Sequence, residues 1–129
     1  MSSLSIEDML TSLKKLVDDF EEIIDFAKGI RYASDRKLIK GFIQRLSNAL
    51  DKTGWLLEES GKATTGDPLM LKYIQTYHAY LTMVTIPYLK DLLDEALFEL
   101  EKKGFREECN DLRVLHDRIS LFLKTSVEV

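Results

Sequence analysis

The sequence contains a single cysteine and two prolines, and asparagine and glutamine are scarce beside many charged side chains. One cysteine, Cys109, excludes a disulfide within the chain, so nothing in the composition indicates an oxidising compartment. Glu7 and Asp8 interrupt the N-terminal region before an apolar run can form, so we predict no signal peptide and a cytoplasmic protein. Few asparagine and glutamine residues together with many charged ones are reported for thermophile proteins, so we predict a thermophilic source.

The chain also lacks a long hydrophobic run. Its longest uncharged stretch, Tyr73–Leu89, is shorter than the roughly 20 predominantly apolar residues that a bilayer requires. Gln75, His78 and Pro87 interrupt this stretch further. We therefore expect no membrane-spanning segment and no membrane partner.

The net charge of the chain is only −4, but acidic and basic residues are unevenly distributed along it. Residues 1–27 carry seven acidic and two basic side chains, whereas residues 28–52 carry seven basic and two acidic ones. An acidic whole with one basic segment argues against a general nucleic-acid-binding protein, whose basic face dominates. The pattern favours a basic helix lying beside acidic helices, in this chain or in a partner.

Helical periodicity marks the first two segments. The first helix is predicted to begin after the N-cap Ser5 and to stop near Gly29. Its apolar residues form a heptad row and a flanking row: Ile6, Leu10, Leu13, Val17, Phe20, Ile24 and Ala27, with Met9, Leu16, Ile23 and Ile30. A second helix follows a cap at Ser34 or Asp35. Gly41 and Gly54 interrupt it at a cost of about 1 kcal/mol each. Close approach of another helix would explain Gly41, and a break of the helix before Trp55 would explain Gly54.

The segment Pro68–Lys103 organises the rest of the chain. Its apolar residues return on more than one face, so we expect a central helix covered on most sides by other helices or by a second copy. Pro87 predicts a kink there, with Thr82 or Thr85 bonding a freed carbonyl. Gly104 ends this helix, and a fourth runs from residue 105 to about residue 125. Short connections then predict an all-α, antiparallel (up-down-up-down) four-helix bundle in a single domain of residues 1–129.

An aromatic row lies on the third helix. Tyr73, Tyr77 and Tyr80 recur at i, i+4 and i+7, and a second row of Ile74, Leu81 and Tyr88 occupies an adjoining face. Two interpretations remain open for the tyrosines. They are core aromatics whose hydroxyl groups reach the rim, or they form an interface with a second copy or a partner protein.

Two pairs of acidic residues suggest an alternative function. Glu22 and Asp25 on the first helix, and Asp91 and Asp94 on the third, each place carboxylates one helical turn apart. Paired motifs of this shape resemble the magnesium ligands of all-α nucleotide pyrophosphohydrolases. A four-carboxylate metal site would require the two turns to meet in the bundle. The competing interpretation is a solvated acidic stripe.

A histidine motif suggests a second alternative. The run His116-Asp-Arg-Ile-Ser120 resembles the phospho-accepting box of sensor-kinase dimerisation helices. It lacks the proline that usually follows, and the Lys-Gly sequence of stand-alone phosphotransfer domains is also absent. The competing interpretation is a boundary histidine at the edge of an apolar face. His78, without a second His or Cys nearby, is predicted to be a core or interface residue.

Signatures of nucleophilic catalysis and of phosphate-binding loops are absent from the sequence. Acidic residues around Cys109 (Glu107, Glu108 and Asp111) are expected to disfavour its thiolate. We therefore predict a non-enzymatic protein–protein interaction module that self-associates through Tyr73, Tyr77 and Tyr80, without cofactor, metal or nucleic acid.

Overall fold

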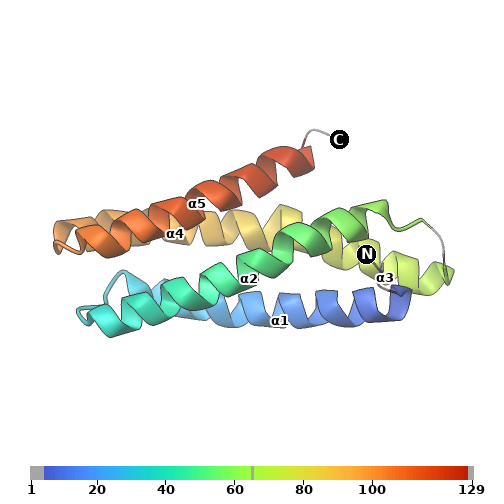
Figure 1. The fold of residues 1–129 in the computed structure, drawn as a ribbon, viewed down its shortest axis with the longest axis horizontal. Coiled ribbons are helices and arrows are strands. Elements are labelled where there is room, and N and C mark those ends of the chain that lie inside the picture. The colour runs from blue at the N-terminus through green and yellow to red at the C-terminus, as the bar shows by residue number, and fades with distance from the viewer. Residues whose placement is uncertain (1–4, 65, 128–129) are drawn as a thin grey trace.

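In the computed structural model, which describes residues 5–64 and 66–127, every regular element is helical. The elements are α1 (Ile6–Ile30), α2 (Arg36–Lys62), α3 (Pro68–Tyr80), the π-helical turn η1 (Leu81–Thr85), α4 (Ile86–Lys102) and α5 (Arg106–Val127). The segment α3–η1–α4 runs without a break and forms one rod of the bundle beside α1, α2 and α5 (Figure 1). The prediction of an all-helical bundle is thereby confirmed. None of these described helices is both long and apolar enough to cross a bilayer.

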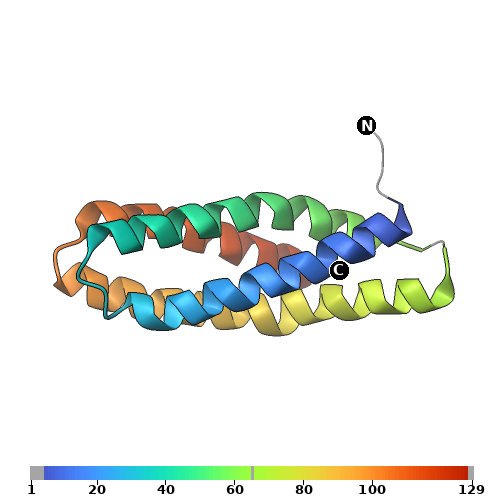
Figure 2. The same cartoon turned by 90° about the horizontal axis from the view of Figure 1, so that it is seen from below.

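The connections gather at the two ends of the bundle. The turns that join α1 to α2 and α4 to α5 lie at one end, and the linker between α2 and α3 lies at the other (Figure 2). The start of α1 and the end of α5 lie toward the linker end. We call the end with the two turns the closed end.

Capping residues set the helix boundaries as the sequence predicts. The side chains of Ser5, Asp35 and Asp67 each accept a hydrogen bond from a backbone N–H two or three residues later. Gly104 has a φ of 87°, and its N–H bonds to the carbonyl of Glu101. A positive φ is accessible to glycine at little cost, so Gly104 ends α4 and turns the chain toward α5.

The core runs between the rods and takes apolar residues from each of them. Its largest fully buried side chains include Phe20 on α1 and Phe42 on α2. On α1, the row expected only to flank the heptad row is buried throughout: Met9, Leu16, Ile23 and Ile30. Three members of the heptad row itself are only partly buried: Ile6, Leu10 and Ile24. Helix α1 therefore turns a broad face inward, as a bundle helix does, in place of a narrow coiled-coil strip.

The two glycines inside α2 differ in their surroundings. Helix α2 continues through Gly54 without a break, and a Cβ there would lie 3.3 Å from Cε1 of Phe122 on α5. Because Gly54 has no side chain, the ring of Phe122 can pack closely against α2 at this position. Gly41 is exposed, and a Cβ there would meet no atom of the described chain within 4 Å. The expected close approach at Gly41 is thus not made by the helices of this chain.

The π-helical turn η1 lies immediately before Pro87. The N–H of Ile86 bonds to the carbonyl of Leu81, five residues back, which is the π-helical pattern. Proline has no N–H and its ring crowds the preceding turn, so a widened turn relieves a clash that a regular helix would retain. The hydroxyl of Thr82 donates to the carbonyls of His78 and Ala79. Thr82 therefore bonds carbonyls three and four residues before it. The predicted contact was with a carbonyl freed by Pro87, which lies about four residues before the proline.

Candidate interaction face

One side of the α3–η1–α4 rod carries a set of exposed apolar side chains. We call it the α3 face, and it comprises Leu69, Tyr73, Tyr80, Met83, Val84 and Tyr88. Met83, at 77% exposure, protrudes most. The other rods of the chain therefore leave one side of this segment open, and the predicted cover by a second copy stays a prediction.

The two aromatic rows take different positions. Ile74 and Leu81 in the second row are fully buried, so this row faces the core for most of its length. In the first row, Tyr73 and Tyr80 are 49% and 42% exposed, whereas Tyr77 is partly buried against the core. The structure thus places two of the three predicted tyrosines outward, and Tyr77 lies at the boundary between the exposed face and the core.

A hollow lies at the junction of the α3 face with α1. It has a volume of about 400 Å³ and is lined by Leu10 and Lys14 of α1 and by Tyr73 and Tyr77 of α3. A cavity bounded by two aromatic rings and a leucine can receive an apolar side chain from another surface. The α3 face therefore combines protruding residues with a recess.

The α3 face has no charge of its own along most of its length. Tyr73–Leu89 contains no Asp, Glu, Lys or Arg, although these four residue types make up 31% of the whole sequence. A charged group lies at the edge of the α3 face, where the Lys28 ammonium group is 5.9 Å from the centre of the Tyr88 ring. An uncharged, aromatic-rich surface with a charged edge has the composition of an interface core surrounded by a polar rim.

His78 lies behind the α3 face and joins α3 to α2. Its Nδ1 is 2.7 Å from the hydroxyl oxygen of Ser60, which is buried and also contacts the carbonyl of Leu57. Burial lowers the pKa of His78 below its ordinary value, because the protonated imidazole loses water there. His78 is therefore a partly buried residue that joins two helices, in agreement with the sequence interpretation.

The lowered pKa of His78 predicts a pH dependence of stability. The unfolded chain binds a proton at this position more readily than the folded chain does, so stability should fall as the pH decreases below about 6.5. A His78→Gln variant should lose this part of the dependence. Urea unfolding at pH 7 and pH 5 would measure both slopes, and identical slopes would contradict the prediction. All other titrating groups are shared by the two proteins and cancel in the comparison.

His116, the centre of the phosphotransfer motif, contacts a different helix. Its Nε2 is buried and lies 2.7 Å from a carboxylate oxygen of Asp94 on α4. Asp117, the acid beside it in sequence, is 3.9 Å from Nδ1, and the Ser120 hydroxyl bonds to the backbone carbonyl of His116. The imidazole is thus oriented by Asp94, and its buried nitrogen is not presented to a phosphoryl donor.

The two acidic pairs of the magnesium hypothesis have separate partners. Glu22 pairs with Arg45, Asp25 with Lys28, and Asp94 with His116. Within residues 5–64 and 66–127, no group of three or more His, Cys, Asp or Glu side chains could hold a metal ion. The structure therefore does not bring the two pairs together into a four-carboxylate site.

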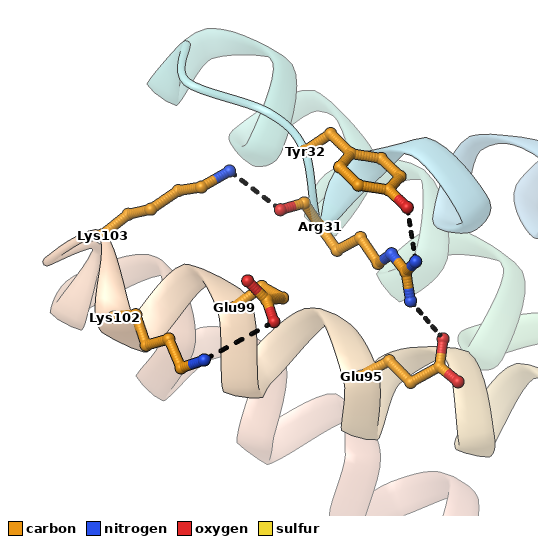
Figure 3. A network of polar contacts seen from close by, with 6 residues as sticks. All are labelled: Arg31, Tyr32, Glu95, Glu99, Lys102 and Lys103. Carbon is orange, nitrogen blue, oxygen red and sulfur yellow. Dashed lines mark hydrogen bonds and ion pairs between the residues drawn. The ribbon is translucent and has the colours of Figure 1, made fainter.

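A polar network that the sequence did not predict fastens the closed end (Figure 3). The guanidinium of Arg31 donates to the hydroxyl of Tyr32 and to Glu95 of α4, and the bond to Tyr32 raises the pKa of Arg31. The ammonium group of Lys103 donates to the carbonyls of Arg31 and Ala33, at 2.8 and 3.1 Å. The contacts of Arg31 with Glu95 and of Lys103 with Arg31 and Ala33 join residues more than 60 positions apart, which no local pattern indicates.

A buried carboxylate lies near the same end. Glu108, in the first turn of α5, is fully buried, and neither oxygen has a hydrogen-bond partner in the described part of the chain. Arg36 of α2 lies 3.4 Å from it and also covers the ring of Phe105. The positive end of the helix dipole and the Arg36 guanidinium both favour a negative charge here. Glu108 therefore ties α5 to α2 electrostatically.

No protein-family model, curated protein or solved structure matches this chain significantly.

Proposed function

We propose that the protein is a non-enzymatic interaction module that self-associates through the α3 face. The observation that carries the proposal is the exposure of Tyr73 and Tyr80 on an uncharged stretch of helix beside a hollow that Tyr73 and Tyr77 line. Tyrosine combines a large apolar area with a hydroxyl that tolerates water, so it serves a surface that is exposed in the monomer and covered in a complex. Tyr77 lines the recess that a side chain of the second copy enters.

Electrostatics favours a second copy as the occupant of this face. Each chain carries a net charge of −4, so two copies repel when their charged surfaces approach. A two-fold interface brings the same patch of both subunits together, and charges of one sign on that patch would face each other. The stretch Tyr73–Leu89 avoids this cost because it carries no charge.

The proposal includes an architecture and a compartment. Connections of about five residues support an antiparallel, up-down-up-down order of the rods, and Pro87 behind a π-helical turn supports a bend in the third rod. Residual dipolar couplings of α3 and α4 would measure that bend, and parallel axes would exclude it. The single cysteine supports a cytoplasmic location.

Replacing Tyr80 by glutamate should weaken self-association about 100-fold, equivalent to about 2.7 kcal/mol. The new carboxylate would have to be desolvated in the interface and would face its own copy across the two-fold axis. Tyr80 is 42% exposed, so the fold of the monomer should tolerate the change. Light scattering on a sizing column would measure the mass, and circular dichroism would check the fold.

The matched control is Val114→Glu on α5. Val114 is 61% exposed and lies outside the α3 face, so the same carboxylate there should leave the mass unchanged. A wild-type protein that stays monomeric at high concentration would refute the proposed function. So would a Tyr80→Glu variant that associates as the wild type does.

A further inference from the structure

A second surface, independent of the α3 face, runs along the outer side of α1 and α2. Three hollows of about 470, 190 and 430 Å³ follow one another there, and all their lining residues belong to α1, α2 or the turn between them. We call this surface the α1–α2 groove. Its length follows both helices from the Trp55 region to the closed end.

Apolar side chains stand exposed at both ends of the groove. Trp55, 42% exposed, lines the first hollow, and Phe26 and Leu38, 42% and 50% exposed, line the hollow nearest the closed end. Large exposed side chains beside a recess are the usual anchors of a protein interface. The middle of the groove is polar, and Arg45 there covers the Phe26 ring.

One glycine at the closed end of the groove has no explanation within one chain. Gly41 lies three residues after Leu38, well inside α2. It is exposed, glycine is unfavourable in a helix interior, and a Cβ there would meet no described atom within 4 Å. Glycine on a helix surface permits a second backbone to approach closely. The closed end of the groove is therefore suited to contact with another helix.

The two helices that border the groove carry opposite charges. Residues 18–27 of α1 include five acidic and no basic side chains, and residues 36–50 of α2 include four basic and no acidic ones. Among the described residues, Asp18 and Glu21 on α1, and Lys37 and Lys40 on α2, have no ion-pair partner. The segments that flank the groove toward the closed end are thus acidic on α1 and basic on α2, whereas the hollows themselves are lined by charges of both signs.

We propose that the α1–α2 groove binds the same groove of a second copy, about a two-fold axis parallel to the helices. Such an axis places α1 of one copy on α2 of the other. The acidic part of α1 then faces the basic part of α2 in both halves of the interface, because these parts lie at the same end of each copy. A two-fold axis across the helices would instead place α1 on α1 and α2 on α2 in opposite directions, so the acidic part of α1 would not meet the basic part of α2.

The groove contact does not depend on the proposed function, since it uses different helices. When both surfaces are occupied, the protein is a tetramer with two kinds of two-fold contact. Blocking one surface leaves a dimer held by the other. The two proposals can therefore fail separately.

The test compares the masses of three variants by sedimentation velocity. Gly41→Glu adds a bulky acidic side chain at the basic border, where there is room for it in the monomer, so it should halve the mass. Tyr80→Glu should also halve the mass, and the two changes together should give a monomer. Val114→Glu should leave the tetramer intact. Circular dichroism would confirm that each variant is folded.

Salt distinguishes the two dimers. The dimer of Tyr80→Glu, held by acid-on-base contacts, should dissociate about tenfold more readily at about 1 M salt than at about 0.1 M, since the Debye length falls from about 10 to about 3 Å. The dimer of Gly41→Glu, held by the uncharged α3 face, should not.

Three results would overturn the groove proposal: wild-type mass for Gly41→Glu, a monomeric Tyr80→Glu, or a Tyr80→Glu dimer that is indifferent to salt. Of these, a monomeric Tyr80→Glu would leave the proposed function standing. An unchanged mass for Tyr80→Glu would refute the proposed function alone. A monomeric wild type would refute both proposals.

Discussion

Replacing Leu81 by alanine is expected to lower the free energy of unfolding by about 3–5 kcal/mol. Leu81 is fully buried and is the first residue of η1. The alanine would leave a cavity that the surroundings can fill only by moving the π-helical turn, which Pro87 and the Thr82 hydrogen bonds hold in place. A loss of this size is a large fraction of the total stability of a small domain.

Met83→Ala in the same turn is the matched control. Met83 is 77% exposed, so its truncation should change the free energy of unfolding by less than about 0.5 kcal/mol in the monomer. Urea unfolding of both variants at low protein concentration would measure the two values. A similar loss for the two variants would mean that truncation destabilises the turn itself, and that core packing of Leu81 is not the cause.

Cys109 is expected to react with a thiol reagent about 1000-fold more slowly, or slower still, in the folded protein than in the unfolded chain. Its side chain is fully buried, so the reagent reaches the sulfur only when the structure opens. Burial is also the main cause that raises the pKa of the Cys109 thiol. Arg113 opposes this shift, and Glu101 and Glu108 add to it. Both access and thiolate fraction therefore protect the sulfur.

Absorbance of the released chromophore, followed in buffer and in concentrated urea, would measure both rates of Cys109. Complete reaction of the native protein at the rate of the unfolded one would show that the α4–α5 packing opens freely. The outcome predicted from the sequence, an unreactive cysteine, has a different main cause in the structure. Of the acidic neighbours Glu107, Glu108 and Asp111, only Glu108 contributes to the shift.

Most of the fold could be predicted because its signals are local. A capping side chain such as Asp67, followed by proline, identifies a helix start from three adjacent residues, and Gly104 identifies an end in the same way. The π-helical turn before Pro87 could not be predicted from such local signals. Proline predicts that the regular hydrogen-bond pattern fails, but it does not predict that the preceding turn widens into a π-helix.

The candidate site was predictable only in part, for a related reason. Periodicity placed Tyr73 and Tyr80 on one face and Ile74 and Leu81 on another, and the structure separates these two pairs. Tyr88, predicted to continue the second row, is exposed on the α3 face instead. Which row faces inward depends on where the other helices lie, and spacing along one helix carries no such information. The contact between Asp94 and His116 was not predicted either. Asp94 was assigned to the magnesium hypothesis and His116 to the phosphotransfer hypothesis, and the two residues lie on different helices.

Lys103 donates hydrogen bonds to the turn between α1 and α2, so the two turns at the closed end are fastened to each other. The start of α1 and the end of α5 both lie toward the opposite end. Under a symmetry axis parallel to the rods, both copies would direct these ends the same way. Cargo fused to either terminus would then be gathered at one end of the dimer that the α1–α2 groove forms.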